Sequence, residues 1–370
     1  MLRFDRRLLQ NFDWVILLFV LIIATMSIMN LYSITYQDQG SSNGLYLKQL
    51  YYFIIGLGVI GVIICFDYRK LLNWDYTIYT ATIITLLYVL VFGLLHVHTK
   101  RWIDLGPVNF QPSEAAKLAL IIVLASYYSR YDTSEGLTLK ELLIPILLTA
   151  VPFLLILKQP DLGTALLLIF IFASMTIFVK LKWSTFAILT TITLSIIPVA
   201  WKFLLKPYQK ERIESLFSPD KNLMTTGYQI FQSKIAMGSG GLLGKGYLKG
   251  TQGHLNFLPE KHTDFAFSIW AEEFGFAGSF IFLVVYFTMI LWGLKISCSS
   301  KDKFGTLLCL GVASLILWQS LINLAMVMGL LPVVGMPLPL FSYGGSSLLT
   351  TMAGIGIMIN VRMRRYQMAR

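Results

Sequence analysis

The sequence contains no charged residue between Phe304 and Val361. A helix that crosses a bilayer needs about 20 consecutive residues that are mostly apolar. The uncharged stretch is long enough for two such helices, joined by the Pro- and Gly-rich segment 329–345. We therefore predict two membrane spans here, with a partly re-entrant connection that protein or a water-filled cavity must enclose.

Uncharged runs recur along the rest of the chain. Hydrophobic residues make up 56% of the sequence and charged residues only 13%, which excludes a soluble domain of this size. The runs 112–129 and 142–157 are weaker, because the first contains two charged residues and the second two prolines. We count both as spans and predict one all-α, polytopic membrane domain, 1–370, with about ten transmembrane helices. The six stronger runs are 14–37, 49–66, 76–99, 162–179, 183–201 and 274–294.

The distribution of Lys and Arg predicts the orientation. Loops rich in these residues stay on the cytoplasmic side of a membrane. The two termini and four loops, near 66–75, 130–141, 180–182 and 295–303, together hold 16 of them, whereas the other short loops hold four. Both termini are therefore predicted to be cytoplasmic, which requires an even number of spans. The net charge of +11 is partly a consequence of this topology, and dispersed loop charges predict no nucleic-acid partner.

The segment 202–263 is predicted to be one large extracytoplasmic loop between the seventh and eighth helices. It holds nine basic and four acidic residues, which suits either an anionic ligand or simple proximity to anionic headgroups. Its run GSGGLLGKG at 238–246 is not a nucleotide-binding loop, because Ser239 and Gly246 break the required pattern. We predict a flexible turn there, whose backbone amides either contact a diphosphate or bind no ligand.

Two ionisable residues lie at the outer end of the fourth predicted span. A charged side chain inside a membrane costs roughly 2.5–3.5 kcal/mol on insertion scales, so each one needs a reason. Glu114 and Lys117 are three residues apart, which puts them on one face of a helix. They either pair with each other or take part in chemistry, and Lys117 has a second possible partner in Asp264.

Two further acids stand at predicted helix starts. Asp161 precedes the sixth span, and Asp264 lies where the long loop enters the eighth span. An acid at a helix N-terminus is a common cap, because its carboxylate accepts free backbone amides. The alternative is a general base, whose pKa would have to be raised by desolvation. The sequence leaves both readings open. Glu272 and Glu273, further into the same helix, are predicted either to be buried partners or to lie at the lipid interface.

The ordered motifs of the chain resemble the SEDS family of cell-wall proteins along nearly its whole length, and the elongation members more than the division members. The resemblance includes Asn323. Its motifs are KRWIDLG at 100–106, QPSE at 111–114, QPDLGT at 159–164, GSGGL at 238–242, LPE at 258–260, HTDF at 262–265, LPVVG at 331–335, PLP at 337–339 and SYGGSS at 342–347.

This resemblance implies a peptidoglycan glycosyltransferase in the bacterial plasma membrane. The enzyme would polymerise lipid II during elongation, beside a class B penicillin-binding protein and other elongation-complex proteins. It further implies Asp264 as the essential acid, with Glu114, Lys117 and Asp161 as supporting residues. We expect Asp264 to be the general base. The departing diphosphate would be stabilised by Arg101, Arg212 and Lys234, or by Mg²⁺ or Mn²⁺, and no organic cofactor is expected.

Two other functions compete with this expectation. A lipid II flippase would line a path across the bilayer with charges. The four ionisable candidates are instead all predicted near the outer boundary, namely Glu114, Lys117, Asp161 and Asp264. A non-catalytic scaffold would use the uncharged segment 304–361 to dock partner helices and would need no buried acid.

Overall fold

The computed structural model describes residues 11–36, 44–95, 101–104, 109–131, 136–204, 207–217, 226–254 and 258–365. Within these ranges, ten α-helices have 17 residues or more. They are α2 (Trp14–Tyr36), α3 (Leu45–Cys65), α4 (Leu71–Leu95), α5 (Pro112–Ser129), α6 (Leu139–Lys158), α7 (Leu162–Phe178), α8 (Trp183–Val199), α12 (Ala266–Cys298), α13 (Lys303–Val327) and α14 (Gly345–Met363).

The length and composition of these helices suit a membrane. Six of them, α2, α3, α4, α6, α12 and α13, are long and apolar enough to cross a bilayer, and α7 and α8 are shorter apolar helices. The remaining two, α5 and α14, are the most polar of the ten. An α-helix satisfies its own backbone hydrogen bonds, which is why helices can lie where no water is available.

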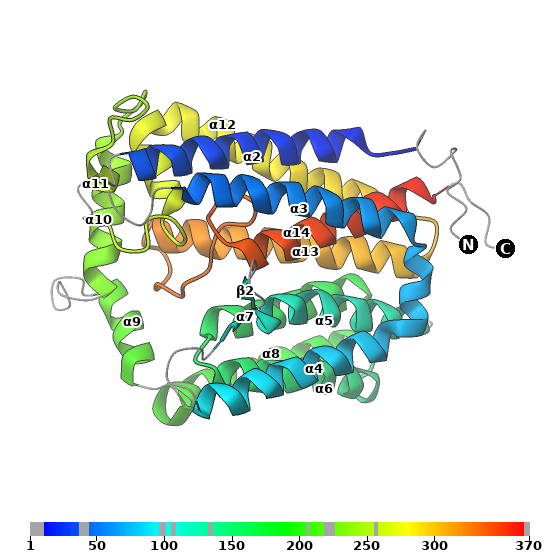
Figure 1. Cartoon of the computed structure of the whole chain (residues 1–370). Coiled ribbons are helices and arrows are strands. Elements are labelled where there is room, and N and C mark those ends of the chain that lie inside the picture. The colour runs from blue at the N-terminus through cyan, green and yellow to red at the C-terminus, as the bar shows by residue number, and fades with distance from the viewer. Residues whose placement is uncertain are drawn as a thin grey trace.

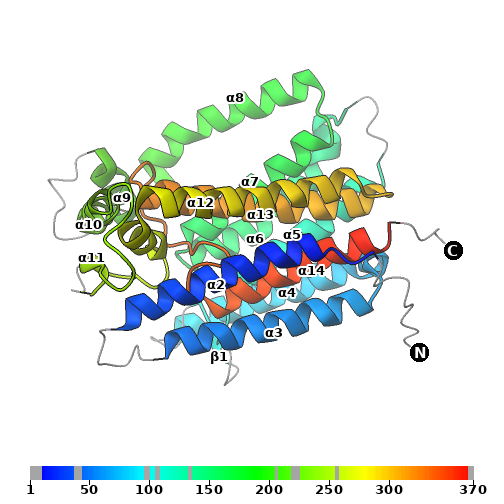
Figure 2. The same cartoon turned by 90° about the horizontal axis from the view of Figure 1, so that it is seen from above.

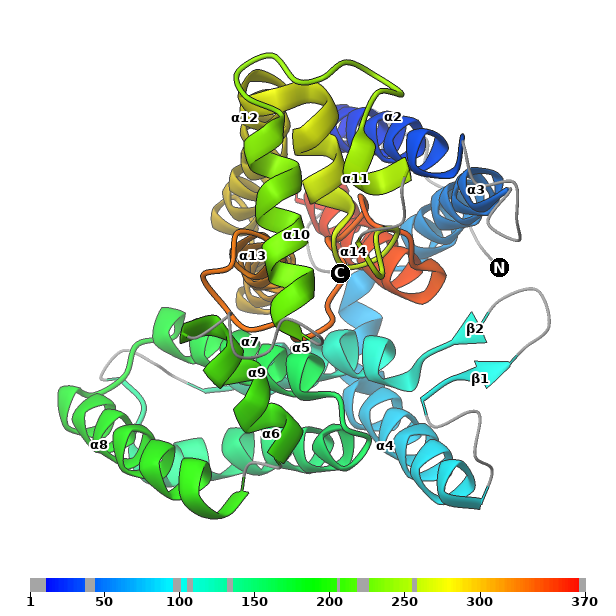
Figure 3. The same ribbon diagram turned by 90° about the vertical axis from the view of Figure 1, so that its left-hand side faces the viewer.

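The long helices run side by side between two distinct ends (Figure 1). The N-terminus and the C-terminus lie at one end of this bundle. The opposite end carries three shorter helices, α9 (Pro207–Phe217), α10 (Thr226–Ser239) and α11 (Thr251–His254). The described residues of the segment 202–263 are therefore mostly helical, and α10 lies across the bundle when viewed from that end (Figure 3).

Two helices form the centre of the bundle. In an apolar stretch of 18 residues in α13, 83% of the residues are buried inside the protein. Helix α5 is buried along almost all of its length. The neighbours of α13 are α5, α7, α12 and α14. By contrast, α8 stands apart from the other helices (Figure 2), and its described side chains are mostly exposed although they are apolar. Such a helix is stable only if lipid surrounds it.

The fold departs from the all-α expectation at one place among the described residues. Strand β1 (Ile103–Asp104) pairs antiparallel with β2 (Asn109–Phe110), with Ile103 opposite Phe110. A β-branched residue facing an aromatic residue is a favourable cross-strand pair, and Pro112 at the first position of α5 marks where the helix starts. The chain is nevertheless mostly helical, as expected, and this short strand pair is a local addition to the helical fold.

The segment between α13 and α14 has no regular structure, and its second half, 336–342, is mostly buried in the protein. Several of its carbonyl groups are bound by side chains. Asn323 donates to Met336 O at 2.6 Å, Gln319 to Pro337 O at 2.9 Å, and the Tyr286 hydroxyl to Pro339 O at 2.9 Å. Irregular backbone can lie inside a helical bundle only when its polar groups are satisfied in this way.

The Gly-rich turn 240–246 inserts into a break in α12. Gly275 has φ 64° and ψ −162°, a backbone conformation open to glycine, and it divides α12 in two. The amides that follow the break bind the turn, Phe276 N to Gly241 O at 2.9 Å and Ala277 N to Leu242 O at 3.0 Å. Within the turn, the amides of Lys245 and Gly246 bind the carbonyls of Glu272 and Glu273, each at 3.0 Å.

Candidate active site

Six parts of the chain meet around a polar cavity of about 290 Å³ at the end of the bundle that carries α9–α11. They are the segment before β1, the N-terminal turns of α5 and α7, the segment that leads into α12, the C-terminal half of α13, and the irregular segment that leads into α14. Five of the predicted site residues line this cavity, namely Arg101, Glu114, Lys117, Asp161 and Asp264. The structure therefore brings together residues that are far apart in the sequence.

Glu114 and Lys117 form a buried ion pair. The distance from Lys117 Nζ to Glu114 Oε2 is 2.7 Å, and both side chains are buried. Lys117 also donates to Gln319 Oε1 at 3.1 Å. Because Pro112 begins α5, Glu114 lies in the first helical turn, where the helix dipole favours a negative charge. Of the two partners considered for Lys117, the structure gives it Glu114.

Asp161 is the N-cap of α7. Its carboxylate accepts the Thr164 amide at 3.2 Å and the Thr164 hydroxyl at 3.0 Å. The capping role considered for Asp161 is therefore correct. Its second oxygen, Oδ2, also lies 3.5 Å from Gln111 Nε2, so the cap faces the polar cavity as well as its own helix.

Asp264 is not a cap, although it immediately precedes α12. The N-cap residue is Phe265, and no side-chain hydrogen bond caps this helix. The Asp264 carboxyl instead lines the polar cavity opposite Gly335, where an added Cβ would lie 3.5 Å from Asp264 Oδ2. Burial and, to a smaller extent, the negative charge of Glu260 raise the pKa of Asp264 to about 6. A carboxyl with this pKa can take up a proton near neutral pH.

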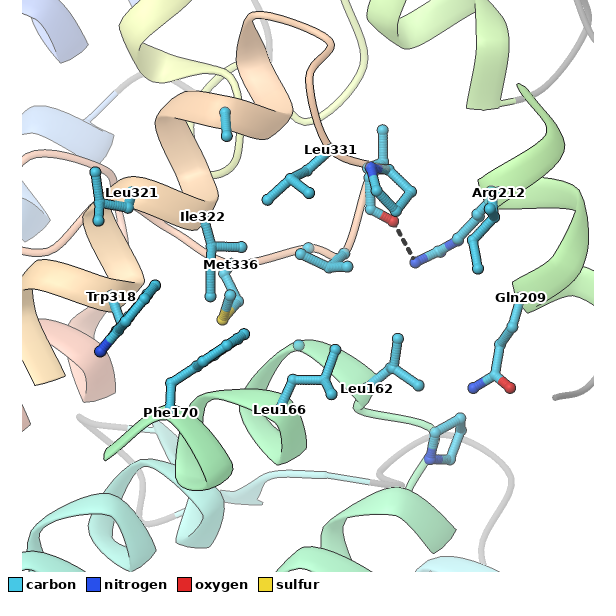
Figure 4. Close-up of a pocket in the computed structure, with 18 of the residues that line it drawn as sticks. Leu162, Leu166, Phe170, Gln209, Arg212, Trp318, Leu321, Ile322, Leu331 and Met336 are labelled. Atoms are coloured by element: carbon cyan, nitrogen blue, oxygen red, sulfur yellow. Dashed lines mark hydrogen bonds between the residues drawn. The ribbon is translucent and has the colours of Figure 1, made fainter. Parts of the chain in front are cut away.

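A second, mainly apolar pocket of about 490 Å³ adjoins the polar cavity. Its walls come from α7, α13 and the segment 331–336, including Leu162, Phe170 and Trp318 (Figure 4). The rings of Phe170 and Trp318 stack with their centroids 4.6 Å apart. The two spaces share Arg101, Gly335 and Met336 as lining residues, so a polar and an apolar compartment lie side by side.

Two of the three predicted basic residues border the apolar pocket. Arg101 donates from Nε to Gln159 O at 2.8 Å and from its guanidinium to Pro160 O. Arg212, on α9, lines the pocket and donates to Val333 O at 2.9 Å (Figure 4). Lys234 lies elsewhere, because its side chain is exposed on α10 and it borders neither space.

The Gly-rich run forms a turn, as the sequence predicts, and its last three amides are bound within the protein. The amides of Gly244, Lys245 and Gly246 already bind carbonyl oxygens at 2.8–3.0 Å, which leaves none of these three for a diphosphate. Glu272 and Glu273 are the buried partners of this turn. Glu272 accepts from Lys245 Nζ at 2.6 Å and Thr251 N at 2.8 Å, and Glu273 accepts from the Ser33 hydroxyl.

Sequence reasoning missed Gln319 and gave Asn323 no role. The two buried residues lie one turn apart on α13, and their amides bind Lys117, the irregular segment and the backbone at Asp264. A signal was present, because an amide side chain inside an uncharged span needs a partner in the bundle. In the part of the chain that the structure describes, no three His, Cys, Asp or Glu side chains gather as metal ligands.

Comparisons with known proteins agree with this arrangement. A family model for the cell cycle proteins FtsW, RodA and SpoVE matches residues 10–367. The peptidoglycan glycosyltransferase MrdB of Escherichia coli K12 is 37% identical over 360 residues, 97% of this chain and 96% of that protein. The peptidoglycan glycosyltransferase RodA of Treponema pallidum is 31% identical, with 96% and 98% of the two chains covered.

Solved structures give the same result. One similar chain comes from a peptidoglycan synthase complex that coordinates polymerization and crosslinking. Its TM-score is 0.81 at 32% identity, covering 96% of this chain and 99% of that one. The rod shape determining protein RodA of Thermus thermophilus has a TM-score of 0.71 at 28% identity, covering 96% and 98%.

Proposed function

This chain belongs to the FtsW, RodA and SpoVE family of multi-pass plasma-membrane proteins and is a peptidoglycan glycosyltransferase, and on that premise we propose that Asp264 is its general base. The proposed substrate is lipid II, which the enzyme joins into glycan strands during cell elongation. The polar cavity around Asp264 is the proposed place of reaction.

The proposed topology has ten spans, with both termini in the cytoplasm and the segment 202–263 outside. The positions of the chain ends support it, because both termini lie at the end of the bundle opposite α9–α11 (Figure 1). The excess of Lys and Arg at the termini supports the same orientation. On this topology the polar cavity opens near the outer face of the membrane, where the sugars of lipid II stand.

One observation carries the assignment of substrate class, namely the contact between the polar cavity and the apolar pocket. A polyprenyl-diphosphate sugar has an apolar tail, a charged linker and a polar head in that order. The apolar pocket fits the first isoprene units, and the polar cavity fits the sugar. Arg101 lines both spaces and therefore lies where the diphosphate joins the two parts of the substrate.

In the proposed reaction, Asp264 removes the proton from the 4-hydroxyl of the acceptor N-acetylglucosamine. The oxygen then attacks C1 of the donor N-acetylmuramic acid with inversion, and the bond from C1 to the diphosphate oxygen breaks. The proton stays on Asp264, and polyprenyl diphosphate leaves with the bonding electron pair. A pKa of about 6 lets Asp264 be ionised at neutral pH and still accept this proton.

The negative charge that develops on the leaving diphosphate needs stabilisation. We assign this role to Arg101 and Arg212, because both line the apolar pocket. Lys234 is too exposed and too far from either space to share it. Since the described acidic residues do not form a three-ligand cluster, no step is assigned to a resident Mg²⁺ or Mn²⁺.

The proposed partner is a class B penicillin-binding protein that crosslinks the new strand. Support comes from the similar chain in a peptidoglycan synthase complex. The competing flippase function finds less support in α5. Between Lys117 and Ser126 this helix contains only apolar residues, about 12 Å of helix without a polar side chain for a headgroup to follow.

The experiment that tests the proposal is glycan formation from purified lipid II. Wild type, Asp264→Asn and Glu214→Gln are compared, each with and without the cognate penicillin-binding protein and with added Mg²⁺ or Mn²⁺. Glu214 is an exposed acid on α9 and serves as the matched control for loss of a carboxylate. We expect full activity in Glu214→Gln and a loss of about 10²–10⁴-fold in Asp264→Asn.

Three outcomes separate the candidate functions. Equal polymer from wild type and folded Asp264→Asn would reject Asp264 as the base. No polymer from any variant, together with lipid II crossing vesicle membranes, would favour the flippase. No polymer and no transport, with the penicillin-binding protein still bound, would favour the scaffold.

A further inference from the structure

We propose that Asn323 is a positioning residue for Asp264, holding the backbone at 264 so that the carboxyl faces the polar cavity. The inference rests on the proposed function, because it assigns Asn323 a part in the reaction that Asp264 performs. Asn323 lies in the last two turns of α13, about 60 residues from Asp264 in sequence, and is fully buried.

The side-chain amide of Asn323 bridges two separate segments. Its Nδ2 donates to Asp264 O at 2.9 Å and to Met336 O at 2.6 Å. Both acceptors are carbonyl oxygens, so the nitrogen and not the oxygen of the amide must face them. The two hydrogens of one NH₂ group are thereby used to join the segment before α12 to the segment before α14.

The start of α12 leaves the Asp264 carbonyl without a local donor. In a regular helix this carbonyl would accept the amide of Ser268, four residues later. Here the Ser268 amide binds Phe265 O at 3.0 Å instead. A carbonyl without a partner inside the protein is unfavourable, and Asn323 supplies the missing donor.

The carbonyls on either side of Asp264 are held in the same manner by other parts of the chain. His262 O accepts the backbone amide of Tyr343 at 2.9 Å, and Ala266 O accepts Asn30 Nδ2 at 2.9 Å. The carbonyls of residues 262, 264 and 266 are thus each held by a different part of the chain. The segment before α14 binds the first, α13 the second and α2 the third. Asn323 is the donor that acts at the residue carrying the proposed base.

The hydrogen bond from Asn323 to Met336 O fixes the backbone that faces the Asp264 carboxyl. Met336 follows Gly335, and an added Cβ on Gly335 would lie 3.5 Å from Asp264 Oδ2. One turn earlier on α13, Gln319 binds Pro337 O at 2.9 Å and Lys117 Nζ at 3.1 Å. The two amides of α13 therefore set the spacing between Asp264, the segment 335–337 and the Glu114–Lys117 pair.

Asn360 offers a matched control for this role. It is also buried, and its Nδ2 also bridges two carbonyls, Ile63 O and Phe66 O, each at 2.6 Å. Those carbonyls belong to the C-terminal end of α3, and Asn360 lines neither cavity. Its Oδ1 also accepts Arg364 Nε at 2.9 Å, so Asn360→Leu breaks one bond more, and its structural cost is at least comparable without a direct effect on Asp264.

The test compares Asn323→Leu with Asn360→Leu, since leucine keeps a similar volume and removes both donors. Thermal midpoints and steady-state lipid II polymerisation are measured for each. We expect similar decreases in midpoint, but a decrease in kcat of about 10–100-fold only in Asn323→Leu, with KM for lipid II nearly unchanged. If Asn323→Leu does not fold, Asn323→Ser, which keeps one donor, should show a smaller decrease in kcat of the same kind.

The inference is overturned if folded Asn323→Leu or Asn323→Ser keeps wild-type kcat, or if it changes KM alone. It is also overturned if Asn323→Leu and Asn360→Leu lose kcat equally. Asp264→Asn, measured in the same preparations, keeps the two proposals apart. Full activity in Asp264→Asn rejects the general base, whereas wild-type kcat in the Asn323 variants beside an inactive Asp264→Asn rejects only the positioning role.

Discussion

Lys117 Nζ lies 2.7 Å from Glu114 Oε2, and the pair is buried one turn into α5. The positive charge of Lys117 is therefore matched within its own helix, and Lys117 also donates to the neutral oxygen of Gln319 at 3.1 Å. Arg212 is a cation that lowers the pKa of Asp264, but its effect is smaller than the raising effects of burial and of Glu260. The carboxyl therefore keeps the high proton affinity that a general base near neutral pH requires.

The ion pair predicts a strongly non-additive effect on stability. Glu114→Ala or Lys117→Ala each leaves one buried charge without its partner, which costs about 3–5 kcal/mol. The double variant removes both charges and should cost much less than the sum. Unfolding in detergent, followed for the two single variants and the double variant, measures the coupling. Additive effects would mean that the two charges do not interact in the folded protein.

The pKa of Asp264 predicts the pH dependence of polymerisation. The general base must be ionised, so kcat/KM should rise with pH through a midpoint near the pKa of about 6 and fall below it. A pH series with purified lipid II measures this limb. The exposed-acid variant Glu214→Gln should keep the same midpoint. A flat profile between about pH 5 and pH 7 would contradict an ionising base with this pKa.

The same pKa shift predicts how Asp264 affects stability. Folding raises the pKa from 3.8 to about 6, so the folded state binds the proton more tightly than the unfolded state. The stability that Asp264 contributes is therefore present below the lower value and is lost as pH rises through the upper one. Asp264→Asn should gain in thermal midpoint over wild type across this interval and keep that gain above it. A constant difference at all pH values would show that ionisation of Asp264 does not oppose folding.

Replacing Gly335 by alanine should cause a loss of stability and activity that the same replacement at an unconstrained glycine should not cause. Its φ of 71° is strained for a residue with a side chain, by about 1–2 kcal/mol, and an added Cβ would lie 3.5 Å from Asp264 Oδ2. Gly335→Ala should lower both the thermal midpoint and polymerisation. The control is Gly58→Ala on α3, where an added Cβ meets nothing within 4 Å. Equal thermal midpoints and equal polymerisation in the two variants would show that position 335 does not specifically require glycine.

The sequence predicts the helices well because their signal is local. Uncharged runs correspond to the long helices, and the stretch from Phe304 to Val361 divides into α13 and α14 as expected. Asp161 could be read as a cap because its partner, Thr164, is three residues away. The termini, the number of spans and the sidedness remain predictions that rest on charge distribution.

The assembly of the site could not be derived from local pattern. Asn323 and Asp264 meet only because α13 packs against α12, and Gln319 meets Lys117 across 202 residues of sequence. The partners of the Gly-rich run could not be predicted for the same reason, since two of the carbonyls that bind its amides belong to α12. The role of Asp264 depends on a cavity that no single segment forms.

The break at Gly275 has a mechanical consequence. The first half of α12 is attached to the outer elements by hydrogen bonds, through turn 240–246 and through Ser268, whose hydroxyl contacts that of Ser233 on α10 at 2.8 Å. Ser233 in turn binds Val327 O at the end of α13 at 2.7 Å. Turn 240–246 binds the second half of α12 as well, because its carbonyls at 241 and 242 accept the amides of Phe276 and Ala277. The half-helix that starts two residues after Asp264 is thus linked by hydrogen bonds to α10, to the end of α13 and, through the turn, to the second half of α12.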